Sequence, residues 1–311
     1  MSAPAMSSAA TAIAPAPDRP SAAATERSGM NSVGEVPHPG TTGTALGETR
    51  PLELQAMHVE ARHILEGYLA SKSQRIQRIA AAALSRTGHE KAIARLRWLL
   101  RAEPVELRKI EIAYALARAG DKDAQKVLRR RMDHKRRDVR LDAARSLVLL
   151  GDNSGASVLE RMLSVRSHRL GAAGLLARIG VTRGIKVLEK ALKDGKVSKE
   201  NKMRALVALG MAGDDSVRER LRELLADRQY SVGAASALAV LSDEAAVETL
   251  QKQLALPSLR VQAALSLRRM GAPADLEVLA AALENGSDPA RVSAAEAVLI
   301  LAGPENIAEF D

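Results

Sequence analysis

The 311-residue chain has no cysteine and only five aromatic residues. The lack of cysteine excludes disulfide bonds and thiolate metal sites, and it is compatible with a reducing compartment. With so few aromatic side chains, leucine and alanine must build the core, which suits thin stacked layers rather than one large centre. No stretch approaches the roughly 18 apolar residues of a transmembrane helix, so we expect no membrane span.

The first fifty residues differ from the rest in composition. They are rich in alanine, proline, serine, threonine and glycine and show no helical periodicity. Such a segment cannot bury enough apolar surface to offset its ordering entropy, so we predict a disordered tail over residues 1–51. It also lacks the basic start and apolar run of an export signal, so we expect a cytoplasmic protein. Residues 52–311 are predicted to form one repeat domain.

Leucine recurs at a fixed position, four residues before a helix-breaking residue. The leucines are Leu84, Leu116, Leu147, Leu176, Leu209, Leu238, Leu267 and Leu299, and the breakers are Gly88, Gly120, Gly151, Gly180, Gly213, Ser242, Gly271 and Gly303. The breakers lie 29 to 33 residues apart. A period in this range is typical of stacked supersecondary units.

Each repeat predicts two amphipathic helices. Apolar residues eight and twelve positions after each breaker share one helical face, as Leu128 and Met132 do. An alanine or isoleucine eight positions before the breaker shares a helical face with the leucine four positions before it, as Ala143 does with Leu147. Glycine closes a helix in the left-handed conformation, and the aspartates that follow four of the breakers are expected to cap the next helix. The fold class is therefore all-α, an α-solenoid of about eight stacked helix pairs.

The run "DHKRRDVRLDAARSLVLLG", residues 133–151, resembles the HEAT-like repeats, specifically the short form of phycobilisome lyase-type proteins. The resemblance covers roughly residues 52 to 303. It implies a right-handed superhelix in which the second helix of each pair lines the concave side. Such repeats serve many unrelated roles, so the resemblance predicts the fold more than the function.

Charge is unevenly distributed along the chain, whose net charge is +9. Residues 51–204 hold 34 basic and 17 acidic residues, whereas residues 205–311 hold 9 basic and 16 acidic ones. We therefore expect a rod with one basic and one acidic end, which would orient in the field of a charged partner.

The densest basic cluster surrounds the turn within one repeat. It comprises Arg129, Arg130, Arg131, Lys135, Arg136, Arg137 and Arg140. Two interpretations stay open: a solvated turn, or a docking patch for an acidic protein surface, nucleic acid or anionic lipid.

A second basic series lies eleven residues before the breakers, on the predicted concave helices. Its members are Lys109, Arg140, Arg169, Lys202 and Arg260. The resemblance implies that such a residue bonds to an acidic residue near the turn, for which Asp138 and Glu200 are candidates. Where that acidic partner is missing, we expect the cation to be available to a ligand. Trp98 lies ten residues after the breaker Gly88, a position at which most of the other repeats carry a charged residue. It is predicted either to anchor an interface or to pack against the first repeat.

The sequence offers no catalytic or metal-binding constellation. Deoxyhypusine hydroxylases are HEAT-like and bind iron through repeated His-Glu pairs, but Ile110 stands where the histidine before Glu111 would be needed. The adjacent pair His89-Glu90 falls at a turn between repeats. Phosphate-binding glycine loops, nucleophile elbows and zincin helices are absent. We therefore expect no metal, no cofactor and no enzymatic activity.

These observations favour a non-catalytic scaffold whose basic half docks an acidic protein surface. A nucleic-acid binder of low sequence specificity is the alternative, although the scarcity of aromatic residues disfavours single-strand stacking. A bilin lyase-like subunit or chaperone is a third hypothesis, suggested only by the repeat subtype.

Overall fold

The computed structural model describes residues 46–303, with side chains from residue 53 onward. The predicted disorder of the N-terminal tail concerns residues that lie largely outside this range. The described residues form sixteen α-helices and no strand. The first eight helices are α1 (Leu46–Tyr68), α2 (Gln74–Ser85), α3 (Glu90–Ala102), α4 (Glu106–Arg118), α5 (Lys122–Arg131), α6 (Arg137–Leu149), α7 (Ala156–Met162) and α8 (Arg169–Arg178). The remaining eight are α9 (Thr182–Lys193), α10 (Lys199–Met211), α11 (Arg218–Leu224), α12 (Ser231–Val240), α13 (Val247–Leu254), α14 (Arg260–Met270), α15 (Leu276–Asn285) and α16 (Asp288–Ala302).

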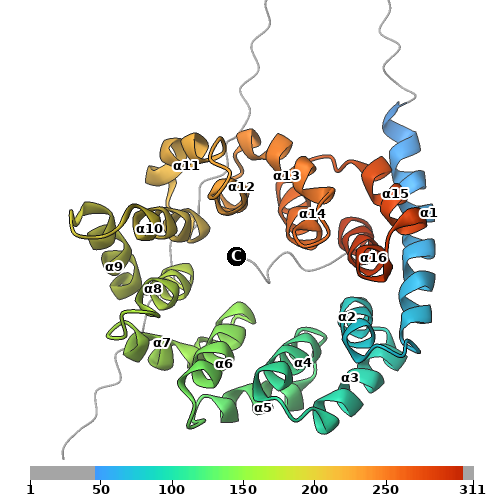
Figure 1. Ribbon diagram of the computed structural model, residues 1–311, viewed down its shortest axis with the longest axis horizontal. Helices are drawn as coiled ribbons and strands as arrows, with labels where there is room; N and C mark the ends of the chain where they lie inside the picture. Colours follow the sequence, from blue (N-terminus) through green and yellow to red (C-terminus); the bar gives the residue numbers. More distant parts are fainter. Residues whose placement is uncertain (1–45, 304–311) are drawn as a thin grey trace, which may run out of the picture. The chain divides into compact units, whose positions relative to one another are not determined.

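The helices pair in sequence order, which confirms the predicted solenoid of eight helix pairs. Single 3₁₀ turns precede α7, α11 and α13. In each pair the second, even-numbered helix lies on the inner side of the array and the first helix lies outside it (Figure 1). Helix α1 begins at Leu46, a few residues before the boundary predicted at residue 52.

The predicted breakers adopt the conformation that ends helices. Six of the glycines have positive φ, and Ser242, at the position of a breaker, has φ 54°. Gly303 is the exception, with φ −78°. The aspartate that follows accepts backbone N–H bonds at the start of the next element, as Asp121 does from Ala124 and Asp243 does from Ala245. Sequence therefore predicted both the ends and the beginnings of these helices.

One continuous aliphatic core runs through all eight pairs. The eight leucines four positions before the breakers are all buried, as are the alanines or isoleucine eight positions before. The small alanines let the inner helices approach closely, so each pair buries its apolar face against the next one. A single pair has too few buried residues to be stable alone.

The array closes on itself, so the predicted rod is wrong. Helix α16 of the last pair packs against α1 and α2 of the first pair, as well as against its neighbours α14 and α15. The pairs therefore follow one another around a closed circuit, which Figure 1 shows for this unit of the chain.

Polar contacts across the closure join residues far apart in the sequence. The Tyr68 hydroxyl donates to Asp288 Oδ1 over 2.7 Å. Arg86 Nε lies 3.4 Å from Glu296 Oε1, and both side chains are largely buried. The ion pair between Arg86, from the basic half of the chain, and Glu296, from the acidic half, thus helps to join the first and last helix pairs.

Helices long and apolar enough to cross a bilayer do not occur between residues 46 and 303.

Candidate functional site

The basic cluster predicted at the α5–α6 turn is largely paired within the protein. Arg129 Nη2 lies 2.8 Å from Asp152 Oδ2. Arg131 Nε lies 2.5 Å from Glu106 Oε2, which belongs to the preceding pair. These arginines join neighbouring helix pairs and have less of their charge to offer a partner.

The turn itself contains further internal bonds. Arg136 Nη2 lies 2.6 Å from Asp138 Oδ2, and both groups are exposed to solvent. Arg140 Nη1 donates to the backbone carbonyls of His134 and Lys135 at 2.8 and 3.0 Å. Three cations of the cluster remain exposed without a side-chain partner in the described part of the chain: Arg130, Lys135 and Arg137.

Three of the five cations eleven residues before the breakers, Arg140, Arg169 and Arg260, donate to carbonyls rather than to the predicted carboxylates. Arg169 Nε donates to the Leu163 carbonyl over 2.9 Å. Arg260 is buried and donates to the Leu254 and Ala290 carbonyls. The Leu163 and Leu254 carbonyls lie at the end of the preceding helix, which leaves them unpaired, whereas Ala290 belongs to the first turn of α16.

The two carboxylates proposed for this series bind other residues. Asp138 pairs with Arg136 and Glu200 pairs with Arg204. Lys109 Nζ reaches Glu106 at 3.2 Å, and Lys202 has no side-chain partner between residues 53 and 303. The predicted acidic tie for Arg140 and Lys202 is therefore wrong, because the local chain offers closer partners.

Sequence reasoning missed a recurring ion pair on the outer helices. An arginine nine residues after a breaker binds the aspartate that follows the next breaker: Arg97 to Asp121, Arg129 to Asp152 and Arg222 to Asp243, at 2.7 to 2.9 Å. Each aspartate also caps the following element, so one carboxylate serves two roles. The fixed spacing of nine was the available signal.

The repeats that follow Gly151, Gly180 and Ser242 lack this ion pair. At the same spacing, Glu160 stands with Val181, Glu189 with Asp214 and Gln251 with Ala272. The first two of these repeats contain α7, α8 and α9, which line the groove described next.

A groove of about 1360 Å³ lies between α6, α7, α8, α9 and α10. Two glycines on α8, Gly171 and Gly174, line it at positions where α6 carries Asp142 and Arg145. A Cβ added at Gly171 would meet no atom within 4 Å, so the space above this helix is open. A Cβ at Gly174 would lie 3.1 Å from the Ala208 Cβ, so this glycine lets α8 pack closely against α10, and the open space lies above Gly171.

Basic side chains surround this groove. Six of them have neither a side-chain hydrogen bond nor an ion pair within residues 53–303: Arg145, Arg161, Arg166, Arg183, Lys190 and Lys196. Arg169 and Arg204 also line it and are bonded internally. The acidic lining consists of Asp142, Glu160 and Asp194. Positive charge therefore exceeds negative charge along these walls.

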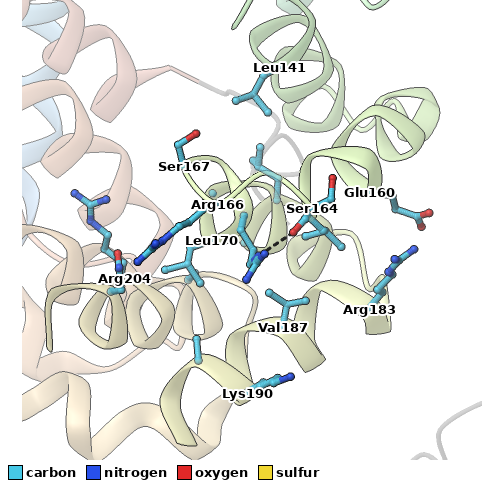
Figure 2. Close-up of a pocket in the computed structure, with 18 of the residues that line it drawn as sticks. Leu141, Glu160, Ser164, Arg166, Ser167, Leu170, Arg183, Val187, Lys190 and Arg204 are labelled. Carbon is cyan, nitrogen blue, oxygen red and sulfur yellow. Dashed lines mark hydrogen bonds between the residues drawn. The ribbon is translucent and has the colours of Figure 1, made fainter. Parts of the chain in front are cut away.

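Figure 2 shows how the groove is arranged. Arg166 and Arg204 lie on one side of the view and Arg183 on the other, with Leu170 and Val187 between them. Further half-buried apolar residues complete the lining, including Leu141, Leu175, Val197 and Met211. No aromatic side chain lines it. The site thus combines an apolar floor with a cationic rim.

Arg178 extends the positive charge to the C-terminal end of α8. Burial lowers the pKa of its guanidinium, and the like charge of Arg145 lowers it further, while Tyr114 acts in the opposite direction. An anion at this end of the groove would relieve the repulsion between the two arginines.

Trp98 is exposed, as predicted for a position at which most repeats carry a charged residue, with 46% of its surface accessible. The guanidinium of Arg95 lies 4.4 Å from the centre of its ring, which is a cation–π contact. Trp98 lies on α3, outside the groove lining. Of the side chains proposed from sequence as partner-binding, Arg169 is the one that lines the groove.

The residues do not fit an iron site of the deoxyhypusine hydroxylase type. Ile110 is buried in the core, and the neighbouring Glu111 lies 3.8 Å from Arg78. His89 caps α3 by accepting from Ala92 N through Nδ1, while Nε2 lies 3.0 Å from Glu66. Between residues 46 and 303 no group of three or more histidine, aspartate or glutamate side chains is arranged to hold a metal ion.

The fold defines an all-helical repeat protein, and residues 98–168 match the family model for HEAT repeats. This match confirms the predicted repeat class for that part of the chain. The chain is also similar to the structure of human deoxyhypusine hydroxylase in complex with glycerol, with 22% identity, coverage of 81% of this chain and 99% of that chain, and a TM-score of 0.37. So loose a likeness implies nothing about the activity of this chain. No curated protein matches it.

Proposed function

We propose that this protein is a non-catalytic helical scaffold that binds an acidic, partly apolar segment of a partner protein in the α6–α10 groove. The observation that carries the proposal is the set of six unpaired cations around an apolar floor. HEAT repeats are suited to this role because their stacked pairs present a pre-formed surface.

The mixed character of the groove favours a peptide over nucleic acid. Carboxylates of a partner would pair with cations such as Arg183 and Lys190, and its aliphatic side chains would cover Leu170 and Val187. A phosphate backbone would use the cations but leave the apolar floor in contact with water. Stacked bases would have no aromatic side chain to contact there.

The exposed cations of the α5–α6 turn support the proposal in a secondary way. Arg137 begins α6, which lines the groove farther along, and Lys135 lies in the turn before it, so both add positive charge near the groove. Long-range attraction of this kind raises the association rate of an acidic partner more than its affinity. The nucleic-acid and bilin-related hypotheses find no further support in the groove, and the compartment stays a prediction.

The test uses a fluorescent ten-residue peptide of glutamate and leucine, acetyl-EELLEELLEE-amide, with a lysine-for-glutamate peptide as a control. Arg183→Glu with Lys190→Glu should weaken binding by about tenfold or more, equivalent to about 1.4 kcal/mol. Lys186→Glu with Lys193→Glu makes the same charge change on the same helix, at exposed positions outside the groove lining. That control variant should bind within about threefold of the wild type, which is about 0.7 kcal/mol.

Equal losses in the two double variants would contradict the proposal, because binding would then depend only on net charge. A duplex DNA of 20 base pairs provides the other arm of the test. If the groove variant lost duplex binding and kept peptide binding, the site would be a nucleic-acid surface instead.

A further inference from the structure

We infer that the partner segment binds as an amphipathic α-helix that lies between α6 and α8 and completes the inner wall of the circuit. This inference rests on the proposed function, since it concerns the same groove. It adds the conformation of the segment and its place among the helices of this protein.

The inner wall is interrupted at one place among the described helices. Around the circuit, neighbouring inner helices pack directly against each other, except α6 and α8, which make no extensive contact. The outer helix α7 packs against both of them and joins them from outside (Figure 1). A helix on the inner side of α7 would therefore supply the packing that the other inner helices obtain from their neighbours.

The groove at this interruption has the volume of a short helix. A helix with its side chains is about 10–12 Å wide and rises about 1.5 Å per residue, so about ten residues fill roughly 1200–1700 Å³. The groove, at about 1360 Å³, lies in this range. About three turns of helix would therefore fill it.

The walls of the groove favour a helix over an extended strand. The described residues form helices and no strand, so the walls offer side chains but no sheet edge. An extended segment would leave its own backbone N–H and C=O groups unpaired against the apolar floor, which costs free energy. A helix pairs these groups within itself and presents only side chains to the groove.

Apolar residues lie on more than one side of the space. Leu141, on α6, stands apart from Leu170 on α8 and Val187 on α9 (Figure 2). Apolar side chains three and four residues apart on one face of a bound helix would contact both sides. Gly171 leaves the surface of α8 bare between them, and a second helix can approach a bare backbone closely.

Cations also stand on both sides of the space. Arg145 on α6 faces it from one side and Arg183 and Lys190 on α9 from the other, and none of the three has a side-chain partner within residues 53–303. The like charges of Arg145 and Arg178 repel, which opposes direct packing of α6 on α8. Acidic residues flanking the apolar face of a bound helix would reverse this effect. The class of partner is therefore an acidic amphipathic helix.

Two peptides of identical composition test the conformation. Acetyl-EELLEELLEE-amide places its leucines on one face of a helix, whereas acetyl-ELELELELEE-amide places them on one face of a strand and scatters them around a helix. The wild-type protein should bind the first peptide about fivefold or more tightly than the second. NMR of isotope-labelled leucines in the bound first peptide should show helical Cα shifts.

Equal binding of the two peptides, or Cα shifts typical of an extended chain, would contradict the inference and leave the proposed function intact. If the protein binds neither peptide, the proposed function fails as well. If the protein sediments as a dimer that the first peptide separates into monomers, the groove holds a second copy of this chain and the inference is wrong.

The position of the helix is tested on α6. Arg145→Glu should weaken binding of the first peptide by about fivefold or more, because the peptide contacts α6 as well as α8 and α9. Arg137→Glu makes the same charge change on the same helix, at an exposed position outside the groove lining, and should change binding by less than about twofold. Equal effects of the two substitutions would place the peptide on one wall only and contradict the inference.

Discussion

Among the residues that end the inner helices, Ser242 has a strained backbone conformation. Six glycines occupy the left-handed region without cost, but at the corresponding joint Ser242 adopts φ 54°. A residue with a Cβ is less stable in that conformation than glycine is. Its hydroxyl makes no hydrogen bond that would compensate within the described part of the chain.

Ser242→Gly should therefore stabilise the protein by about 0.5–1 kcal/mol, partly offset by the greater freedom of glycine in the unfolded chain. Gly120→Ala, at φ 88°, should destabilise it by about 1 kcal/mol for the converse reason. Urea unfolding of both variants measures these changes. A destabilising effect of Ser242→Gly would show that the serine contributes more than its conformation suggests.

The carboxylates between outer helices couple stability to pH. Burial raises the pKa of Asp243, but hydrogen bonds from Arg218, the Ala245 amide and Arg222 outweigh it and hold the pKa below its ordinary value. A folded-state pKa below the unfolded one means that the carboxylate contributes stability at neutral pH. That contribution is lost as the pH falls from about 4 through the folded pKa.

Asp243→Asn should cost about 2 kcal/mol at pH 7, because two arginines lose a charged acceptor. The cost should shrink at pH 3, below the ordinary pKa of an aspartate, where the stabilising contribution of the ionised group has begun to fall. Urea titrations at the two pH values and constant salt check this difference. The same cost at both values would contradict the role assigned to the ionised group.

At the scale of helices, the sequence pattern predicted where elements end better than which side chains join them. The apolar periodicity and the breakers predicted the helix pairs, because burial and backbone conformation depend directly on the type of each residue. Ion-pair partners depend on which of several long basic side chains lies nearest to a given carboxylate. Arg136 reaches Asp138 within the turn, so Arg140 is left to bond with carbonyls.

The closure between α16 and α1–α2 depends on a largely buried ion pair, Arg86 with Glu296. Glu296→Gln should destabilise the protein by about 3 kcal/mol, because it removes the negative charge of one partner from a largely buried ion pair. Glu248→Gln, which removes an exposed pair with Lys252, should cost less than about 0.5 kcal/mol.

Thermal unfolding followed by circular dichroism measures both changes. Similar small effects of the two substitutions would indicate that apolar packing alone closes the circuit.

At the scale of the molecule, the sequence predicted eight stacked pairs but not their closure. The rotation from one pair to the next depends on small differences in packing that a repeat pattern does not encode. Only when eight rotations add up do the first and last pairs meet. The charge asymmetry that suggested a polar rod partly serves contacts such as Arg86 with Glu296.

The groove could be predicted only in part. Sequence reasoning located the excess of positive charge in residues 51–204, which supply nearly all of the groove lining, and named Arg169, which is part of that lining. It favoured the α5–α6 turn because the cations are densest there, but density along the sequence also brings internal acidic partners such as Glu106 and Asp152. The informative signal was Gly171 on α8, at a position where the neighbouring inner helices α6 and α10 carry Asp142 and Arg204.

The most direct test of the central claim fills the groove without removing a charge. Gly171→Leu places a side chain in open space on α8, and leucine favours the helix, so the protein should be at least as stable as the wild type. Gly67→Leu is the matched control on α1. We predict that Gly171→Leu weakens binding of the glutamate-leucine peptide by about tenfold or more, about 1.4 kcal/mol, while Gly67→Leu leaves it unchanged. Unchanged binding in a stable Gly171→Leu protein would contradict the account.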